Sequence, residues 1–148
     1  MNSLKSGEGN HIYREIYWYT STTDQRIKFY SGTAVYHKTI HFNQPSSGEQ
    51  VLLRFPQLGS IARVVINGEE VSTVWCSPWE ADLTAHIKKG ENTLEIYVAN
   101  CLTNRMIGDA SLPQAERFTY AYPEIASPKD RLVASGIIDK VLLVKRSN

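Results

Sequence analysis

Apolar and polar residues alternate with a period of two over several stretches of the chain. Within 34–42, apolar or aromatic residues such as Tyr36 and Phe42 alternate with residues that point to the opposite face. A period of two with many β-branched and aromatic residues predicts a strand. The same pattern returns at 94–99. Further strands are expected at 51–55, 61–66, 71–75 and 140–145.

Turn signals separate these strands. Asn67-Gly68 follows the apolar stretch 61–66 directly. Both central residues of a type I′ turn need positive φ, and Asn-Gly meets that need best, so a β-hairpin is expected there. Asp82 and Thr84 are expected to cap one short helical turn, because their side-chain oxygens can accept from unpaired backbone N–H groups at a helix start.

The order of these signals predicts the fold class. Short strands joined by turns at fairly regular spacing, with almost no helix, indicate an all-β antiparallel β-sandwich, and a barrel is the alternative. From 100 to 131 the alternation stops, and this long segment is either a functional loop or ordered coil. With 148 residues the chain suits a single core. We expect a flexible leader at 1–11 and one sandwich domain at 12–148.

Composition and charge exclude several classes of partner. Sixteen Lys and Arg face fifteen Asp and Glu, and the two signs are mixed along the chain, so no basic stripe is present that would follow a phosphate backbone. Nucleic acid is therefore not an expected partner. No apolar run approaches the roughly 20 residues that a membrane helix needs, and the first residues lack the apolar segment of a signal peptide.

The two cysteines, Cys76 and Cys101, are too few and too isolated for a zinc cluster. We expect each to be a small buried apolar residue, and a disulfide between them stays open. No motif joins either thiol to a histidine and an orienting carboxylate, so neither is a candidate nucleophile.

Three stretches resemble a known family. They are IKFYSGTAVYHKTIHF at 27–42, QLGSIARVVINGEEVSTVWCSPWEADLTAHIKKGENTLEIYVAN at 57–100 and NRMIGD at 104–109. Together they are similar to the galactose-binding-like jelly roll of family 2 glycoside hydrolases, and most of all to the C-terminal sandwich of family 106 α-L-rhamnosidases. The resemblance covers about residues 13 to 146. The chain departs from the pattern at Cys101-Leu102, where a Thr-Trp is common, at Gln57, where Asp is usual, and at Asp139-Lys140, which replaces Gly-Pro.

The resemblance implies a module that carries no catalysis. In those enzymes the hydrolytic carboxylates lie on a (β/α)₈ barrel of about 250 residues, which this chain cannot contain. Hydrolysis here would need two carboxylates about 5 to 9.5 Å apart across a cleft, and the sequence pairs none of its candidates in that way. The candidates are Glu69, Glu70, Glu80, Asp82, Glu91, Asp109 and Glu124.

Two functions remain open. The first is a non-catalytic module of a glycoside hydrolase of the α-L-rhamnosidase or β-galactosidase type, with an oligosaccharide or glycoside as its partner. The second is a purely structural accessory that braces a catalytic barrel or a partner chain and binds no sugar. By resemblance, either would work in the bacterial periplasm or outside the cell. No cofactor is expected, although the oxygen-rich turns at 82–84 and 104–109 could hold a structural calcium ion.

Some side chains stand out as candidate sugar contacts. Trp79 lies outside the family motif, so it is free to be an exposed stacking platform or to pack under the segment 110–131. Arg105 offers a planar fork to a sugar hydroxyl or a carboxylate, or it connects the loop after Asn100 to the sandwich. The carbohydrate candidates are Trp79, Asn104, Arg105, Asp109, Tyr120 and Tyr122. The residues expected to serve structure are Trp75, which packs on the sheet, with Pro78, Asn67, Gly68, Asp82 and Asn100.

Overall fold

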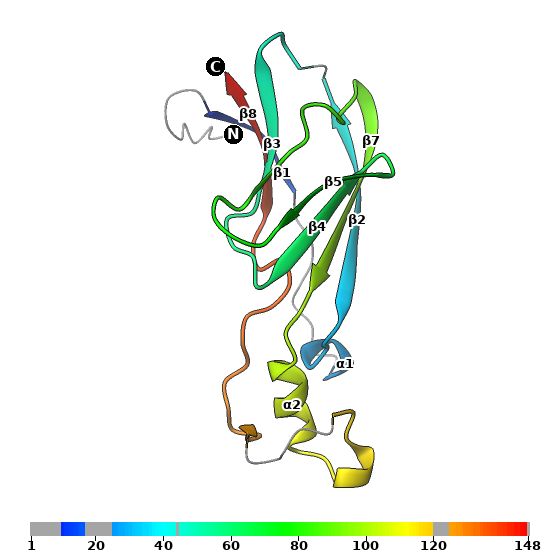
Figure 1. Cartoon of the computed structure of the whole chain (residues 1–148), viewed down its shortest axis with the longest axis vertical. Coiled ribbons are helices and arrows are strands. Elements are labelled where there is room, and N and C mark those ends of the chain that lie inside the picture. Colours follow the sequence, from blue (N-terminus) through cyan, green and yellow to red (C-terminus); the bar gives the residue numbers. More distant parts are fainter. Residues whose placement is uncertain (1–9, 17–24, 44, 120–124, 148) are drawn as a thin grey trace.

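The computed structural model describes residues 10–16, 25–43, 45–119 and 125–147. In this part of the chain, eight strands form two four-stranded sheets with the orders β1-β8-β3-β6 and β2-β7-β4-β5, and every pairing is antiparallel. The two sheets lie face to face as an antiparallel β-sandwich (Figure 1). The predicted fold class is confirmed. The strands are β1 (Asn10–Ile16), β2 (Thr33–Phe42), β3 (Glu49–Arg54), β4 (Ile61–Ile66), β5 (Glu69–Val74), β6 (Glu80–Asp82), β7 (Gly90–Ala99) and β8 (Val141–Ser147).

Alternate residues of the facing strands form the core. Side chains that point inward, such as Ile40 of β2 and Ile96 of β7, are completely buried, whereas their neighbours in the strand are more exposed. Because successive side chains of a strand point to opposite faces, one register places all the apolar positions of a strand between the sheets. The residues in this cluster are Ile40, Phe42, Val51, Leu53, Phe55, Ala62, Val64, Ile66, Val74, Ala81, Leu83, Ile87, Leu94, Ile96, Val98, Ile137, Val141 and Leu143.

The structure adds elements that the sequence pattern did not predict. Strand β6 has only three residues, too few for a recognisable alternation. Strand β1 begins at Asn10, so the last two residues of the expected leader, Asn10 and His11, pair with β8; residues 1–9 lie outside the described residues. The segment 100–131, expected to be irregular, contains the helix α2 (Thr103–Asp109) and the 3₁₀ turn η1 (Gln114–Glu116). A further short helix is α1 (Gln25–Lys28).

The helical part lies beyond one end of the sandwich. Strand β7 leads almost directly into α2, and the chain returns to β8 through a long connection, as Figure 1 shows. Gly59 lies where this connection meets the sandwich, and its N–H donates to the carbonyl of Gly136. A Cβ at Gly59 would approach the backbone of Ser135 to 2.6 Å, so only glycine allows this contact. The neighbouring Leu58 bridges to Ile137.

The predicted Asn-Gly hairpin is present between β4 and β5. Asn67 and Gly68 have φ of 52° and 82°, as a type I′ turn requires. Asn67 does more than turn the chain, because its amide donates to the carbonyl of His86 and to Asn92 Oδ1, and its Oδ1 accepts from Thr93 N. Asn92 is buried and in turn bonds the backbone of Lys88. The two amides therefore join the hairpin to the connection between β6 and β7.

Candidate functional site

The polar residues singled out after β7 do lie together, on α2. Arg105 Nη2 lies 2.9 Å from Asp109 Oδ1, and the Asp109 side chain is almost fully buried. The other carboxylate oxygen, Asp109 Oδ2, accepts from the backbone N–H groups of Phe118 and Thr119 and from the Thr119 hydroxyl, at 3.1, 2.8 and 2.8 Å. Asp109 thus contacts its own chain through both oxygens and holds the segment after η1 against the helix.

Asn104 serves the same purpose on another side of α2. Its Nδ2 donates to the carbonyl of Val133 at 2.8 Å, and its Oδ1 accepts from Val133 N at the same distance. The side-chain amide of Asn104 thus bonds both the N–H and the carbonyl of Val133, as the backbone of a neighbouring strand would do. Asn104 is buried. The contacts of Asn104 and Asp109 connect α2 to the long segment that follows it, at Phe118, Thr119 and Val133.

Arg105 also contacts an aromatic ring. Its guanidinium lies 4.7 Å from the centre of the Phe118 ring, and that ring is 75% exposed. Arg105 Nε is buried and has no hydrogen-bond acceptor, and Asn100 Oδ1 is a buried acceptor without a donor. Asp109 Oδ1 likewise lacks a hydrogen bond of good geometry, although its 2.9 Å approach to Arg105 makes it an ion-pair partner. Tyr120 and Tyr122, the aromatic candidates nearby in sequence, lie outside the described residues.

The two tryptophans differ in exposure, and Trp75 departs from its expected place. Trp79 is partly buried and packs against the core cluster, and its carbonyl accepts from Phe55 N at 2.8 Å. Trp75, which was expected to pack on the sheet, is 67% exposed. The physical reason is the strand alternation, because Val74 points into the core and the next residue must point outward. Pro78 lies in the exposed turn that connects the two tryptophans.

The cysteines correct a second expectation. Both Cys76 and Cys101 are free and exposed rather than buried. Cys76 follows Trp75 in the same exposed turn, and Cys101 lies between the end of β7 and α2, beyond the sandwich core. Their places at the ends of strands, where the alternation no longer buries every second residue, explain the exposure.

Each described carboxylate among the hydrolytic candidates contacts another side chain or the backbone of this chain. Glu80 pairs with Arg54 at 2.6 Å and with Arg146 at 3.3 Å. Asp82 accepts from the N–H and the hydroxyl of Thr84, so the expected capping bond forms, but around a turn rather than a helix. Glu124 lies outside the described residues. The remaining pairs are Glu69 with His86, Glu70 with Arg63, Glu91 with His41 and Asp109 with Arg105.

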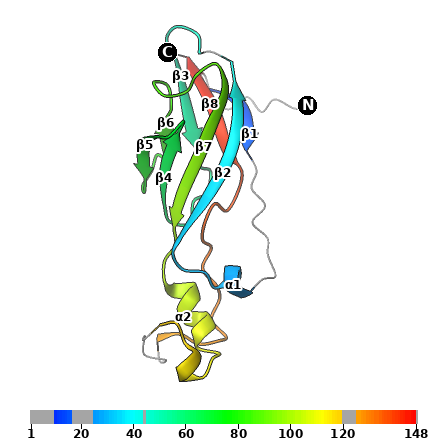
Figure 2. The same cartoon turned by 90° about the vertical axis from the view of Figure 1, so that its right-hand side faces the viewer.

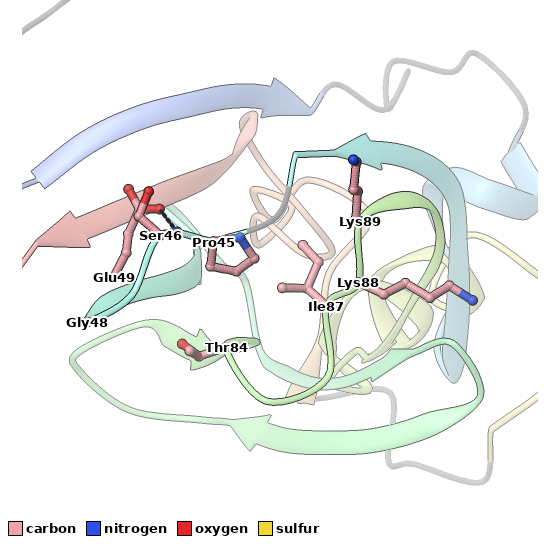
Figure 3. A pocket seen from close by; sticks show the side chains of 8 residues that line it. All are labelled: Pro45, Ser46, Gly48, Glu49, Thr84, Ile87, Lys88 and Lys89. Carbon is pink, nitrogen blue, oxygen red and sulfur yellow. Dashed lines mark hydrogen bonds between the residues drawn. The ribbon is translucent and has the colours of Figure 1, made fainter.

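A hollow of about 520 Å³ opens at the end of the sandwich that is formed by the β2–β3 and β6–β7 connections. Its floor includes Pro45 and Ile87, and Figure 3 shows the ends of Lys88 and Lys89 directed away from Glu49. Thr84 Oγ1 already accepts from Val51 N, and Glu49 pairs with Lys145 at 3.2 Å. The side chains of Thr84 and Glu49 are therefore committed to the fold, and no aromatic ring is among the lining residues.

The outer face of the sheet β2-β7-β4-β5 carries a connected polar network that sequence reasoning missed. Arg63 pairs with Glu70 at 3.1 Å and lies 4.1 Å from the centre of the Tyr97 ring. The Tyr97 hydroxyl donates to Glu95 Oε2 at 2.8 Å, and this bond is the main cause that raises the pKa of Tyr97 above its ordinary value of 10.0. His37 Nδ1 lies 3.5 Å from Glu95. Only the strand register could have revealed this network, because its members come from four strands.

The described residues contain no group of three or more metal-ligating side chains. At both turns offered to calcium, the oxygens of Asp82 and Asp109 are engaged by the chain itself. No helix in the described ranges is long and apolar enough to cross a membrane.

Known proteins similar to this chain are large enzymes. A protein of Formosa agariphila named "Putative beta-glucuronidase" is 37% identical over 123 residues, which are 82% of this chain and 10% of that protein. The structure of a rhamnosidase from Novosphingobium sp. PP1Y superposes with a TM-score of 0.83 and 26% identity, over 97% of this chain and 16% of that chain. A β-glucuronidase from an uncultured Clostridium sp. shares the fold with a TM-score of 0.64 and 19% identity, over 100% of this chain and 31% of that chain.

The chain thus spans about a tenth of the length of the curated relative it matches. The expected likeness to family 2 sandwiches and to a rhamnosidase is confirmed. The family model for the sugar-binding domain of family 2 glycosyl hydrolases matches residues 2–147. That match covers nearly the whole chain and agrees with the jelly-roll-like sandwich, and the chain belongs to this family of sugar-binding domains.

Proposed function

We propose that this chain is a non-catalytic module that contacts carbohydrate within, or alongside, a glycoside hydrolase. The observation that carries the proposal is the family match over residues 2–147. The named functions of similar proteins, a rhamnosidase and β-glucuronidases, suggest that the parent enzyme removes rhamnosyl or glucuronyl groups.

The state of the carboxylates supports a role without catalysis. A general acid in a glycosidase needs a carboxyl group with a raised pKa, opposite a second carboxylate across a cleft. Here Glu80 lies between two arginines, and Asp109 lies beside Arg105 and accepts three hydrogen bonds. Both carboxylates are therefore held by contacts with their own chain, whereas a hydrolytic pair must face the glycosidic bond across a cleft.

Two measurements test the proposal. Titration of the isolated chain with rhamnose-, galactose- and glucuronate-containing glycosides, followed by calorimetry or by NMR shifts, is expected to show weak binding of at least one of them in the millimolar range. The same preparation is expected to release no product from nitrophenyl rhamnoside, galactoside or glucuronide. A chain that cleaves any of these unaided would contradict the non-catalytic role. A chain that binds none of them at tens of millimolar would contradict the carbohydrate contact.

The bracing role is the second candidate, and one observation favours it. Large apolar side chains are exposed on the helical part beyond the sandwich, where a solitary domain gains nothing from them. They are Ile27, Tyr30, Leu102, Phe118, Ile125 and Val133. If this role is the correct one, the isolated chain binds no glycoside, and charged substitutions such as Phe118→Asp leave its stability unchanged but prevent its association with the catalytic part of the parent enzyme.

A further inference from the structure

One end of the outer face of the sheet β2-β7-β4-β5 presents exposed apolar side chains next to hydroxyl groups. The strand register places Thr33, Ala99 and Ile61 in one row across β2, β7 and β4. The next row contains Val35, Tyr97, Arg63 and Thr73, in strand order. Figure 2 shows these four strands side by side. Neighbouring strands lie about 4.8 Å apart, so the side chains of each row form a continuous strip.

Trp75 directly follows β5 at the edge of the sheet. Val74 is the last residue of β5 and pairs with Ala62, which directs the chain that follows toward Ile61. Trp75 is 67% exposed, and Ile61 and Val35 are 46% and 43% exposed. An indole with one face open to solvent is a surface on which the apolar face of a pyranose ring can stack, because a large aromatic group gains more from burial than any other side chain.

The polar groups on this face fit a sugar better than a protein partner. The hydroxyls of Thr33 and Thr73 are exposed and interrupt the apolar side chains, so the face lacks the continuous apolar patch that marks a protein interface. Thr73 lies two residues before Trp75 on β5, whereas Thr33 lies on β2 at the opposite edge of the sheet. A hydroxyl group beside an aromatic ring helps to fix the orientation of a small polar ligand.

The charges on the face select among sugars. Arg63 is already neutralised by Glu70, and Glu95 adds a second carboxylate. With His37 neutral, these groups sum to one negative charge. A uronate brought to this face would meet a guanidinium that is already paired and a carboxylate of its own sign, whereas a neutral sugar would not.

We propose that the outer face of the sheet β2-β7-β4-β5, at the end where Trp75 emerges, is the carbohydrate-contact surface of this module and takes a neutral pyranoside stacked on Trp75. The inference rests on the proposed function and names the site for it. In this proposal Trp75 takes the place of Trp79 as the stacking residue, because Trp79 packs against the core.

The test is a titration of the whole ¹⁵N-labelled chain with methyl α-L-rhamnoside, methyl β-D-galactoside and methyl β-D-glucuronide, followed in NMR spectra. The indole N–H signal of Trp75, assigned from its loss in Trp75→Ala, is expected to move with the neutral glycosides. Trp75→Ala is expected to weaken their binding by roughly tenfold or more, and Trp75→Phe by less, because a smaller ring remains. The matched controls are Phe118→Ala, an exposed aromatic on the helical part, and Ser46→Ala in the hollow, and both are expected to bind as the unchanged chain does.

The outcomes separate the two proposals. If the unchanged chain binds a glycoside and Trp75→Ala binds it equally well, the site is wrong while the proposed function stands; loss of binding in Ser46→Ala alone would move the site to the hollow. If no glycoside binds at tens of millimolar, the proposed function fails, and the site fails with it. Tighter binding of the glucuronide than of the neutral glycosides overturns the selection by charge. Signal shifts of Trp75 that follow protein concentration instead of sugar concentration would identify a second copy of the chain as the occupant.

Discussion

Asp109 shows how a single buried carboxylate can organise a surface segment. It accepts three hydrogen bonds from Phe118 and Thr119 and pairs with Arg105. Each of these contacts replaces water that a carboxylate loses on burial, and an incomplete set would leave a charge in a poorly solvated place. The exposed Phe118 ring therefore has a defined position over Arg105 because of a residue that no ligand can reach.

The substitution Asp109→Asn tests this role. It keeps the volume of the side chain but removes the charge and leaves Arg105 largely buried without a partner. We expect the free energy of unfolding to fall by about 3 kcal/mol. Urea unfolding followed by tryptophan fluorescence measures the change. Glu91→Gln is the control, because its pair with His41 is exposed and is expected to change stability by about 0.5 kcal/mol or less. Equal midpoints for the two variants would show that the Asp109 contacts do not support the fold.

The two tryptophans show the limit of residue-level reasoning. Sequence reasoning assigns Trp75 to packing on the sheet and Trp79 to the candidate sugar contacts, but the exposure of Trp75 depends on where β5 ends. A shift of one residue in a strand exchanges the buried face for the exposed face. Whether Trp75 points inward therefore depends on the last residue that keeps the extended backbone, which periodicity cannot locate to within one residue.

At the scale of elements, the helix α2 explains most of what sequence pattern missed. Its N-cap residue, Leu102, offers no side-chain cap, its first turn has no acidic residue, and Gly108 lies inside it. Each of these features argues against a helix when the sequence is read alone. The helix forms because buried contacts, made by Asn104, Ile107, Gly108 and Asp109, compensate for weak local preference.

Gly108 provides the test of that explanation. Alanine in place of glycine inside a helix normally adds about 1 kcal/mol of stability. Here a Cβ would lie 2.6 Å from Cγ and 2.9 Å from Cβ of Phe29, close to the root of that side chain, where rotation gives little relief. We therefore expect Gly108→Ala to lower the free energy of unfolding, by about 1–3 kcal/mol.

A thermal scan of Gly108→Ala, alone and combined with Phe29→Ala, separates the two effects. In the double variant the contact with Cγ is absent and only the 2.9 Å approach to Cβ of residue 29 remains, so Gly108→Ala is expected to cost less stability in the Phe29→Ala background than in the unchanged chain. A single variant that is more stable than the unchanged chain would contradict the close packing of α2 against Phe29.

At the scale of the whole molecule, the last strand is structurally central. Strand β8 lies between β1 and β3, so it joins the first strand of the described chain to the rest of its sheet. Val141 and Leu143 point into the core, and Leu142 and Val144 form a second buried cluster with Leu52 on the same sheet. A sandwich with one central strand missing exposes two unpaired strand edges and part of its core.

Truncation after Lys140 is therefore expected to abolish cooperative unfolding. The shortened chain should lack a sharp thermal transition in circular dichroism and bind a hydrophobic dye, whereas a control chain that ends at Ser147 should unfold as the complete chain does. A sharp transition in the chain that ends at Lys140 would show that β1, β3 and β6 form a stable sheet without β8.

The sequence by itself determined the strands with a clear alternation, the Asn-Gly hairpin and the sandwich class, and it grouped Asn104, Arg105 and Asp109 correctly. These features depend on contacts between neighbours in the chain or on periodicity. Both can be recognised in a single sequence. Tertiary structure alone decided that α2 is a helix, that β6 completes a sheet, that Trp79 packs and Trp75 is exposed, and that Glu80 pairs with Arg54 and Arg146. These outcomes depend on which residues from distant segments meet, and the packing of two sheets against each other chooses those partners.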